Sequence, residues 1–225
     1  MTGKIQDGAI LTPDAFPKGF KGLVFDIDGV LFDSRASNMV YYNSIRKAVD
    51  LPPLSKAEED FCHMASVHDA LETVFPPELR PAAYEACRSI NYVKEILPML
   101  QLEPDLIATL AWLQENAIPC GILTNRSTSV MDLLRHFSLE AYFSSVKTAA
   151  TGRPKPHPDG LLATLDEWQV DAQQIAFLGD SQVDQLAAEA ASVFFWSYRN
   201  PDLQADLHVT SFVGLAHSIR PLVEG

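Results

Sequence analysis

The sequence predicts an α/β fold in which a doubly wound parallel sheet carries a helical insert after its first core strand. From residue 21 onward, short apolar runs alternate with stretches of helical periodicity. The runs are apolar throughout, which is typical of parallel strands covered by helices on both faces. The 70 residues from 34 to 103 interrupt this alternation with helix patterns alone. Strands that alternate with helices indicate right-handed crossovers and an open sheet.

The apolar runs give the expected core strands, and helix start signals lie between them. Ser127 is expected to cap a helix over 128–137, and Asp159 is expected to cap a helix over 160–168. The expected strands span 22–25, 118–123, 175–178 and 193–196.

The insert is predicted to be helical because its apolar residues recur at helical spacing. Ser55 with Glu58 fits a capping box, and Ser66 with Asp69 resembles a second one. We find no convincing strand pattern between 34 and 103. The expected organisation is therefore a core domain of residues 20–33 and 104–219, a helical cap domain of residues 34–103, and an N-terminal extension of residues 1–19.

Composition excludes several classes of partner. Lys and Arg number 17 and Asp and Glu number 29, so the formal net charge is −12. Such a surface repels nucleic-acid phosphates, and no basic run offsets it, so we expect neither nucleic acid nor a membrane as a partner. The first residues lack the apolar core of a secretory signal. Three scattered cysteines fit reduced thiols. A cytoplasmic protein is expected.

Polar residues gather where the predicted strands end. Asp26 and Asp28 follow the first strand, Thr124 follows the second, and Asp180 and Asp184 follow a later strand. In an open parallel sheet these ends share one edge, where ligands bind. Lys155 lies in the loop before the helix that leads to the later strand. The gap of 98 residues between the first two strand ends is too long for one α/β unit, and the insert accounts for the excess.

Carboxylates brought together at one sheet edge repel one another unless a cation lies among them. Carboxylate and carbonyl oxygens suit Mg²⁺. A carboxylate, a divalent cation, a Thr hydroxyl and a Lys together make a pocket for a phosphoryl group, in which a carboxylate can attack phosphorus in line. Taken alone, Asp180 could equally serve as a helix cap, and Thr124 and Lys155 could be ordinary structural residues.

The motifs together resemble those of the haloacid dehalogenase superfamily. The resemblance rests on four segments in the family's order and spans roughly residues 20–215: Asp26-Ile-Asp28-Gly29-Val30-Leu31, Leu123-Thr124-Asn125, Lys155-Pro156 and Gly179-Asp180-Ser181-Gln-Val-Asp184. The insert between the first two motifs is similar to the cap of the phosphoglycolate phosphatase and β-phosphoglucomutase-like branch. The resemblance also implies a Rossmann-like core.

Roles follow from the resemblance, motif by motif. Asp26 would be the nucleophile that forms an aspartyl-phosphate, and Asp28 would protonate the leaving oxygen and then activate water. The phosphoryl group would be held by Thr124, Asn125 and Lys155. Mg²⁺ would be bound by the Asp26 side chain, the Asp28 backbone carbonyl and the Asp180 side chain, with Asp184 and Ser181 behind these ligands. The implied activity is Mg²⁺-dependent hydrolysis of a small organic phosphate monoester.

Other functions remain open at this point. A sugar-phosphate mutase of the β-phosphoglucomutase type would keep every motif and differ only in its cap. A non-catalytic phosphoryl-binding or signalling domain would be shorter and would lack the insert. The sequence does not identify the phosphorylated metabolite or the oligomeric state. Basic candidates for a second anionic group of the substrate are Arg35, Arg88, Lys94 and Arg126, and the histidines at 63, 68 and 157 are expected to be surface or cap residues.

Overall fold

The computed structural model describes residues 5–6, 9–10, 17 and 19–224. Most of the expected N-terminal extension therefore lies outside the described residues. Among the described residues, eight strands form one sheet in the order β1-β2-β10-β9-β8-β3-β6-β7. The six strands from β10 to β7 are all parallel, and β2 adds to the edge in the antiparallel sense. The doubly wound parallel fold is confirmed.

The strands of this sheet are short, and four of them overlap the expected runs, although β6 begins two residues later and β9 ends two residues later than expected. They are β1 (Ile5–Gln6), β2 (Ala9–Ile10), β3 (Gly22–Phe25), β6 (Cys120–Leu123), β7 (Phe143–Lys147), β8 (Ile175–Gly179), β9 (Phe194–Tyr198) and β10 (Leu207–Val209). The sequence analysis predicted none of β1, β2, β7 and β10. Two serines separate the apolar residues Phe143 and Val146 of β7, and one of them, Ser145, is buried although it is polar. The strand therefore shows no continuous apolar run.

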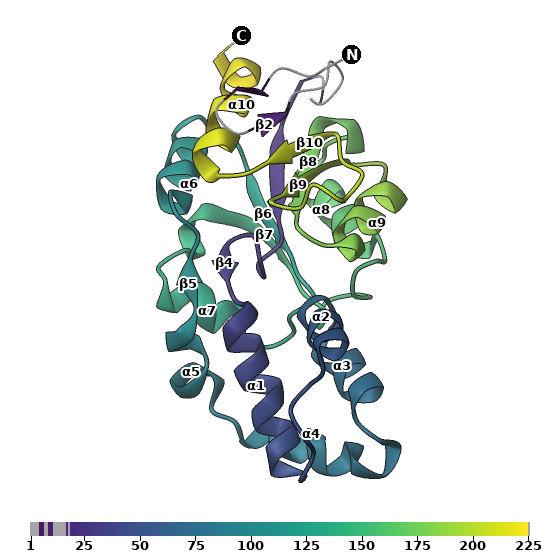
Figure 1. Cartoon of the computed structure of the whole chain (residues 1–225). Helices are drawn as coiled ribbons and strands as arrows, with labels where there is room; N and C mark the ends of the chain where they lie inside the picture. Colours follow the sequence, from purple (N-terminus) through teal and green to yellow (C-terminus); the bar gives the residue numbers. More distant parts are fainter. Residues whose placement is uncertain (1–4, 7–8, 11–16, 18, 225) are drawn as a thin grey trace.

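Helices cover both faces of the sheet (Figure 1). One face packs against α6 (Leu106–Glu115), α7 (Val130–His136) and α10 (Phe212–Glu224), and the other against α8 (Asp159–Trp168) and α9 (Gln182–Ala191). Two expected helix starts are wrong by one or two residues. The N-cap of α7 is Ser129 and not Ser127, and Asp159 lies inside α8, whose N-cap is Pro158.

The helical insert lies beyond the carboxyl ends of the core strands, at the bottom of Figure 1. Its helices are α1 (Arg35–Ala48), α2 (Lys56–Met64), α3 (Val67–Val74), α4 (Arg80–Ser89) and α5 (Tyr92–Glu95). The capping box of Ser55 and Glu58 is formed, and Ser66 accepts a hydrogen bond from the Asp69 N–H. A hydrophobic cluster around Tyr42, Ile45 and Leu71 belongs to the insert alone.

The chain enters and leaves the insert through two adjacent strands. β4 (Phe32–Asp33) pairs antiparallel with β5 (Gln101–Leu102), so both connections form one narrow ribbon. The expectation of no strand between 34 and 103 is therefore wrong at β5. Two residues are too few for a periodic pattern, so the pairing has no signature in the sequence.

Candidate active site

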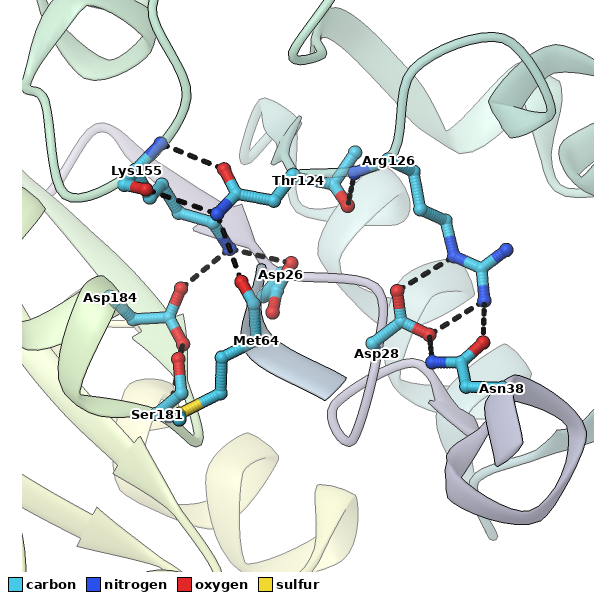
Figure 2. A network of polar contacts seen from close by, with 10 residues as sticks. Asp26, Asp28, Asn38, Met64, Thr124, Arg126, Lys155, Ser181 and Asp184 are labelled. Carbon is cyan, nitrogen blue, oxygen red and sulfur yellow. Dashed lines mark hydrogen bonds and ion pairs between the residues drawn. The ribbon is translucent and has the colours of Figure 1, made fainter. Parts of the chain in front are cut away.

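The central strands bring the predicted polar residues to one edge of the sheet. β3 lies between β8 and β6, so the strand order reverses at β3, and this is where open α/β sheets bind ligands. Asp26 follows β3, Thr124 follows β6, and Asp180 follows β8. All three line one cavity of about 310 Å³, together with Asp28 and Lys155. The close-up in Figure 2 shows Lys155 directed at Asp26 and Asp184, with Asp28 facing Arg126 to one side.

A buried lysine connects two of the carboxylates. Lys155 Nζ lies 2.8 Å from Asp26 Oδ1 and 2.6 Å from Asp184 Oδ1, and the lysine side chain is 2% exposed. Burial alone would lower the pKa of Lys155, but the two carboxylates outweigh it and raise that pKa above its ordinary value. Lys155 is therefore a fixed positive charge beside Asp26.

Both carboxylate oxygens of Asp184 accept hydrogen bonds from neighbouring residues of the protein. Its Oδ1 accepts from Lys155, and its Oδ2 accepts from the Ser181 backbone N–H at 3.0 Å and from the Ser181 hydroxyl. Ser181 is the N-cap of α9 and forms a capping box with Asp184. Asp180 consequently does not cap this helix, and its carboxylate is available for another role.

Two glycines, one in the loop after β3 and one at the end of β8, allow acidic side chains to approach the backbone closely. Gly29 has a φ of +76°, and a Cβ there would overlap the Asp180 carboxylate. At Gly179 a Cβ would overlap the side chain of Asp184. The close approach needs glycine at both positions. Asn200, in the loop after β9, fixes the same region, because its Nδ2 donates to the Asp180 backbone carbonyl at 2.8 Å.

The acidic cluster carries more negative charge than the protein compensates. Asp26, Asp180 and Asp184 each place an oxygen within 4.8 Å of the others. Burial raises the pKa of Asp26 to about 7, against the lowering effect of Lys155, and Asp184 and Asp28 add to the increase. Burial, Asp184 and Asp26 likewise raise the pKa of Asp180 well above its usual range. Burial and the neighbouring carboxylates therefore both disfavour the ionised forms of Asp26 and Asp180.

The donor set fits a hard divalent cation. With Asp28 and Arg126 included, four carboxylates face two fixed cations, which leaves a formal charge of −2. The oxygens of Asp184 are taken, so Asp26 and Asp180 are the side chains that can hold the ion. Mg²⁺ usually binds one or two carboxylates and keeps several waters, which is what this pair offers.

Asp28 lies in a separate ion pair. Arg126 donates from Nε to Asp28 Oδ2 at 2.7 Å and from Nη2 to Asp28 Oδ1 at 2.6 Å, and Asn38 Nδ2 donates to Oδ1 at 3.1 Å. Figure 2 shows this second group beside the lysine cluster. Burial would raise the pKa of Asp28, but the Arg126 charge and hydrogen bonds overcome it and hold that pKa below its ordinary value. The sequence identified Arg126 only as one of four basic candidates.

Thr124 and Asn125 shape the loop after β6. Thr124 is 1% exposed, and its Oγ1 accepts from the Arg126 N–H at 3.2 Å. Asn125 accepts from the Lys155 N–H at 2.7 Å and donates to the backbone carbonyls of Lys155 and Met64, each at 3.0 Å. Asn125 thus holds the lysine loop in place and connects the core to α2 of the insert.

The insert supplies cavity residues that sequence reasoning missed. Asn38 of α1 contacts Asp28, and Tyr92 of α5 accepts a hydrogen bond from Arg126. His63 of α2 lines the cavity, with Nδ1 3.4 Å from Asn38 Nδ2. Of the other basic candidates, Arg88 lines the cavity, whereas Arg35 pairs with Asp60 and neither it nor Lys94 is a lining residue. No motif marked these positions, because their convergence depends on how the insert folds over the core.

Comparison with known proteins places this arrangement in a family. The family model for haloacid dehalogenase-like hydrolases matches residues 23–197. The chain belongs to this family. A phosphoglycolate phosphatase of Yersinia pestis is 30% identical over 190 residues, covering 77% of this chain and 78% of that protein. The phosphoglycolate phosphatase and β-phosphoglucomutase-like branch inferred from the sequence is confirmed, and this hydrolase is an enzyme whose curated relatives are phosphatases.

Solved structures agree with that placement. The crystal structure of a HAD-superfamily hydrolase of subfamily IA from Geobacter sulfurreducens has a TM-score of 0.73 and 33% identity, and covers 92% of this chain and 98% of that one. A β-phosphoglucomutase from Clostridium difficile has a TM-score of 0.78 and covers 91% and 97%, but at 19% identity it supports the fold alone. Within the described part of the chain, no helix is long and apolar enough to cross a membrane.

Proposed function

We propose that this hydrolase is a Mg²⁺-dependent phosphatase that cleaves a small organic phosphate monoester through an aspartyl-phosphate on Asp26. The observation that carries the proposal is the position of the Asp26 carboxylate. It lies at the end of the central strand, faces the cavity, and is held between Lys155 and the cluster with Asp180. A carboxylate fixed beside a cation site can attack phosphorus.

Each remaining residue has a role in binding or proton transfer. Mg²⁺, bound by the Asp26 and Asp180 side chains and the Asp28 backbone carbonyl, would neutralise phosphoryl oxygens when present. Lys155 neutralises a further oxygen, and the Thr124 hydroxyl donates to the phosphoryl group. Asn125 positions the Lys155 loop through the contacts described above. Asp184 and Ser181 hold Lys155 from behind.

The reaction then runs in two steps, the formation of the aspartyl-phosphate and its hydrolysis. An Asp26 oxygen forms a bond to phosphorus as the ester P–O bond breaks, and the leaving oxygen takes a proton from Asp28. In the second step water attacks phosphorus and gives a proton to Asp28, and the bond between phosphorus and the Asp26 oxygen breaks, which releases inorganic phosphate and restores the Asp26 carboxylate. Asp28 can do this only after it leaves Arg126, because that ion pair holds it ionised.

The substrate is a small phosphorylated metabolite, for which 2-phosphoglycolate is the first compound to test. Relatives from Photorhabdus laumondii and Yersinia pestis are phosphoglycolate phosphatases, and a cavity of about 310 Å³ suits a small molecule. The three cysteines are free, in keeping with the cytoplasmic location that we propose. The decisive experiment measures phosphate release from a panel of phosphorylated metabolites with and without Mg²⁺. Absence of release from every member would overturn the proposal.

A sugar-phosphate mutase is the second candidate, because a β-phosphoglucomutase shares the fold over most of the chain. Incubation with β-glucose 1-phosphate, followed by phosphorus NMR, separates the two activities. Free phosphate as the product supports the phosphatase, and glucose 6-phosphate without free phosphate supports the mutase.

We also propose that residues 34–103 act as a cap domain over a core of residues 20–33 and 104–219. Its own hydrophobic cluster and the β4–β5 ribbon at its base support this division. Replacing residues 38–100 with a short linker should leave a folded core that cleaves an activated aryl phosphate but has lost selectivity among natural esters. A folded core that retains the preferences of the full chain would contradict the proposal.

A further inference from the structure

Arg126 is the most heavily bonded side chain in the cavity. Besides its two hydrogen bonds to Asp28, its Nη2 donates to Asn38 Oδ1 at 3.2 Å and its Nη1 donates to the Tyr92 hydroxyl. Its guanidinium lies 5.5 Å from the centre of the Tyr92 ring, and its side chain is 10% exposed. The three residues that contact this guanidinium, Asp28, Asn38 and Tyr92, all line the cavity.

This arrangement conflicts with the proposed role of Asp28. A bidentate pair engages both carboxylate oxygens, so neither is directed at a leaving group. Asp28 must leave the guanidinium to act, and a buried guanidinium left without a counter-ion is strongly unfavourable. Arg126 cannot turn to solvent without breaking its contacts with Asn38 and Tyr92. Another anion has to take the place of Asp28.

We propose, on the basis of the proposed function, that Arg126 recognises a second anionic group on the organic part of the substrate. That group replaces Asp28 on the guanidinium, and Asp28 is thereby released to face the leaving oxygen. A phosphate ester without such a group leaves Asp28 bound to Arg126 and is a poor substrate. Arg126 is thus a specificity-determining residue that also positions Asp28.

The surroundings favour a planar, compact anion close to the phosphoryl site. The guanidinium fork matches a carboxylate in two parallel hydrogen bonds, and Asn38 Nδ2, which donates to Asp28 at 3.1 Å, can donate to the replacing oxygen. Arg126 lies two residues after Thr124, and its backbone N–H donates to the Thr124 hydroxyl oxygen at 3.2 Å. One loop therefore carries the residues proposed to bind both ends of the substrate. A carboxylate and a second phosphate share this chemistry.

The other cations of the cavity are less suited to this role. Lys155 is committed to Asp26 and Asp184 at 2.8 and 2.6 Å. Arg88 pairs with Glu85 at 2.6 Å, and its side chain is 66% exposed. Solvent weakens the attraction between an exposed arginine and an anion. Arg88 therefore serves as a matched control, because it is also an arginine that lines the cavity.

The test compares three esters that share a two-carbon skeleton and differ in the second group. These are 2-phosphoglycolate, its uncharged amide phosphoglycolamide, and ethylene glycol bisphosphate. Dissociation constants are measured by calorimetry on Asp26→Asn protein in saturating Mg²⁺, in which turnover is blocked, and kcat/KM is measured on the chain with Asp26 intact. The same measurements follow for Arg126→Gln, Arg126→Lys and Arg88→Gln.

With Arg126 present, at least one of the two anionic esters should exceed the amide by about tenfold or more in both affinity and kcat/KM. Whichever ester does so identifies the second group as a carboxylate or a phosphate. Arg126→Gln should remove most of this ratio, largely through KM, Arg126→Lys should retain part of it, and Arg88→Gln should keep it. Equal binding of all three esters, or an unchanged ratio in Arg126→Gln, would overturn the assignment.

Failure of the proposed function gives a different result. Absence of phosphate release from all three esters, with the anion preference intact in calorimetry, would reject the hydrolysis and support the role of Arg126. Phosphate release without any anion preference would support the hydrolysis and reject the role of Arg126.

Discussion

The sheet edge and the helical insert contribute to one cavity by different means. At the sheet edge, charged side chains are buried and fixed by one another, as Lys155 is by Asp26 and Asp184. The insert contributes uncharged polar groups, such as the Asn38 amide and the Tyr92 hydroxyl, and a backbone carbonyl at Met64. In the proposed function the sheet edge therefore supplies the reacting groups, and the insert supplies uncharged groups that contact them.

The largest expected effect is at the sheet edge. Asp26→Asn removes the proposed nucleophile and should lower kcat by a factor of about 1000 or more, because uncatalysed ester hydrolysis is extremely slow. Phosphate release from 2-phosphoglycolate measures this. The same change in the insert, Asp60→Asn, alters a half-exposed carboxylate paired with Arg35 and should leave kcat within about twofold. Substantial turnover by Asp26→Asn would reject the covalent route.

The second effect concerns the cation. Asp180→Asn removes one of the two carboxylates free to hold Mg²⁺ and should weaken Mg²⁺ binding by about tenfold or more, measured by calorimetry and by the Mg²⁺ dependence of phosphate release. Asp202→Asn, at an exposed position, is the control. Wild-type Mg²⁺ affinity in Asp180→Asn would place the ion elsewhere.

The same contrast explains what the sequence could predict. Asp26, Thr124 and Asp180 were predictable because each directly follows a strand, and parallel topology alone brings strand ends to one edge. Asn38, His63 and Tyr92 were not, because their positions depend on how five helices pack over that edge. The pairing of Arg126 with Asp28 spans 98 positions and follows from neither periodicity nor spacing. β7 was missed because tertiary pairing overrides its weak apolar pattern.

A third prediction uses the pKa of Asp26, which burial raises to about 7 in the protein without metal. A carboxyl group whose pKa is higher in the folded than in the unfolded state binds its proton more tightly in the folded state, which stabilises the fold. This contribution is complete below the unfolded pKa near 4 and is lost as the pH rises through the folded pKa of about 7. In EDTA, the free energy of unfolding of Asp26→Asn should therefore increase relative to that of the wild type by roughly 1–3 kcal/mol between pH 5 and pH 8.

Thermal unfolding of the two proteins at both pH values measures this gain. Mg²⁺ at pH 8 should reduce the difference, since only the wild type has the full carboxylate pair. A difference in Tm that does not change with pH would show that Asp26 is ionised without cost, and the acidic cluster would then not need a cation.

The smallest expected effect compares two capping boxes, one in each region. Ser55 caps α2 in the insert, where its N–H donates to Glu58 at 2.7 Å on an exposed surface. Ser181 caps α9 in the core, where its partner Asp184 also holds Lys155. Loss of either hydroxyl should lower the free energy of unfolding by about 1 kcal/mol, because a capping acceptor is lost in both.

Activity should separate the two variants. Ser55→Ala leaves every cavity residue in place and should keep kcat within about twofold, whereas Ser181→Ala removes a donor from Asp184 Oδ2 and should lower kcat by about three- to tenfold through a less fixed Lys155. Ser181→Thr retains the hydroxyl and should recover most of the loss. Denaturant unfolding and phosphate release on the same samples measure both quantities. Equal losses of kcat in Ser55→Ala and Ser181→Ala would mean that helix stability in general, and not the hold of Asp184 on Lys155, limits catalysis.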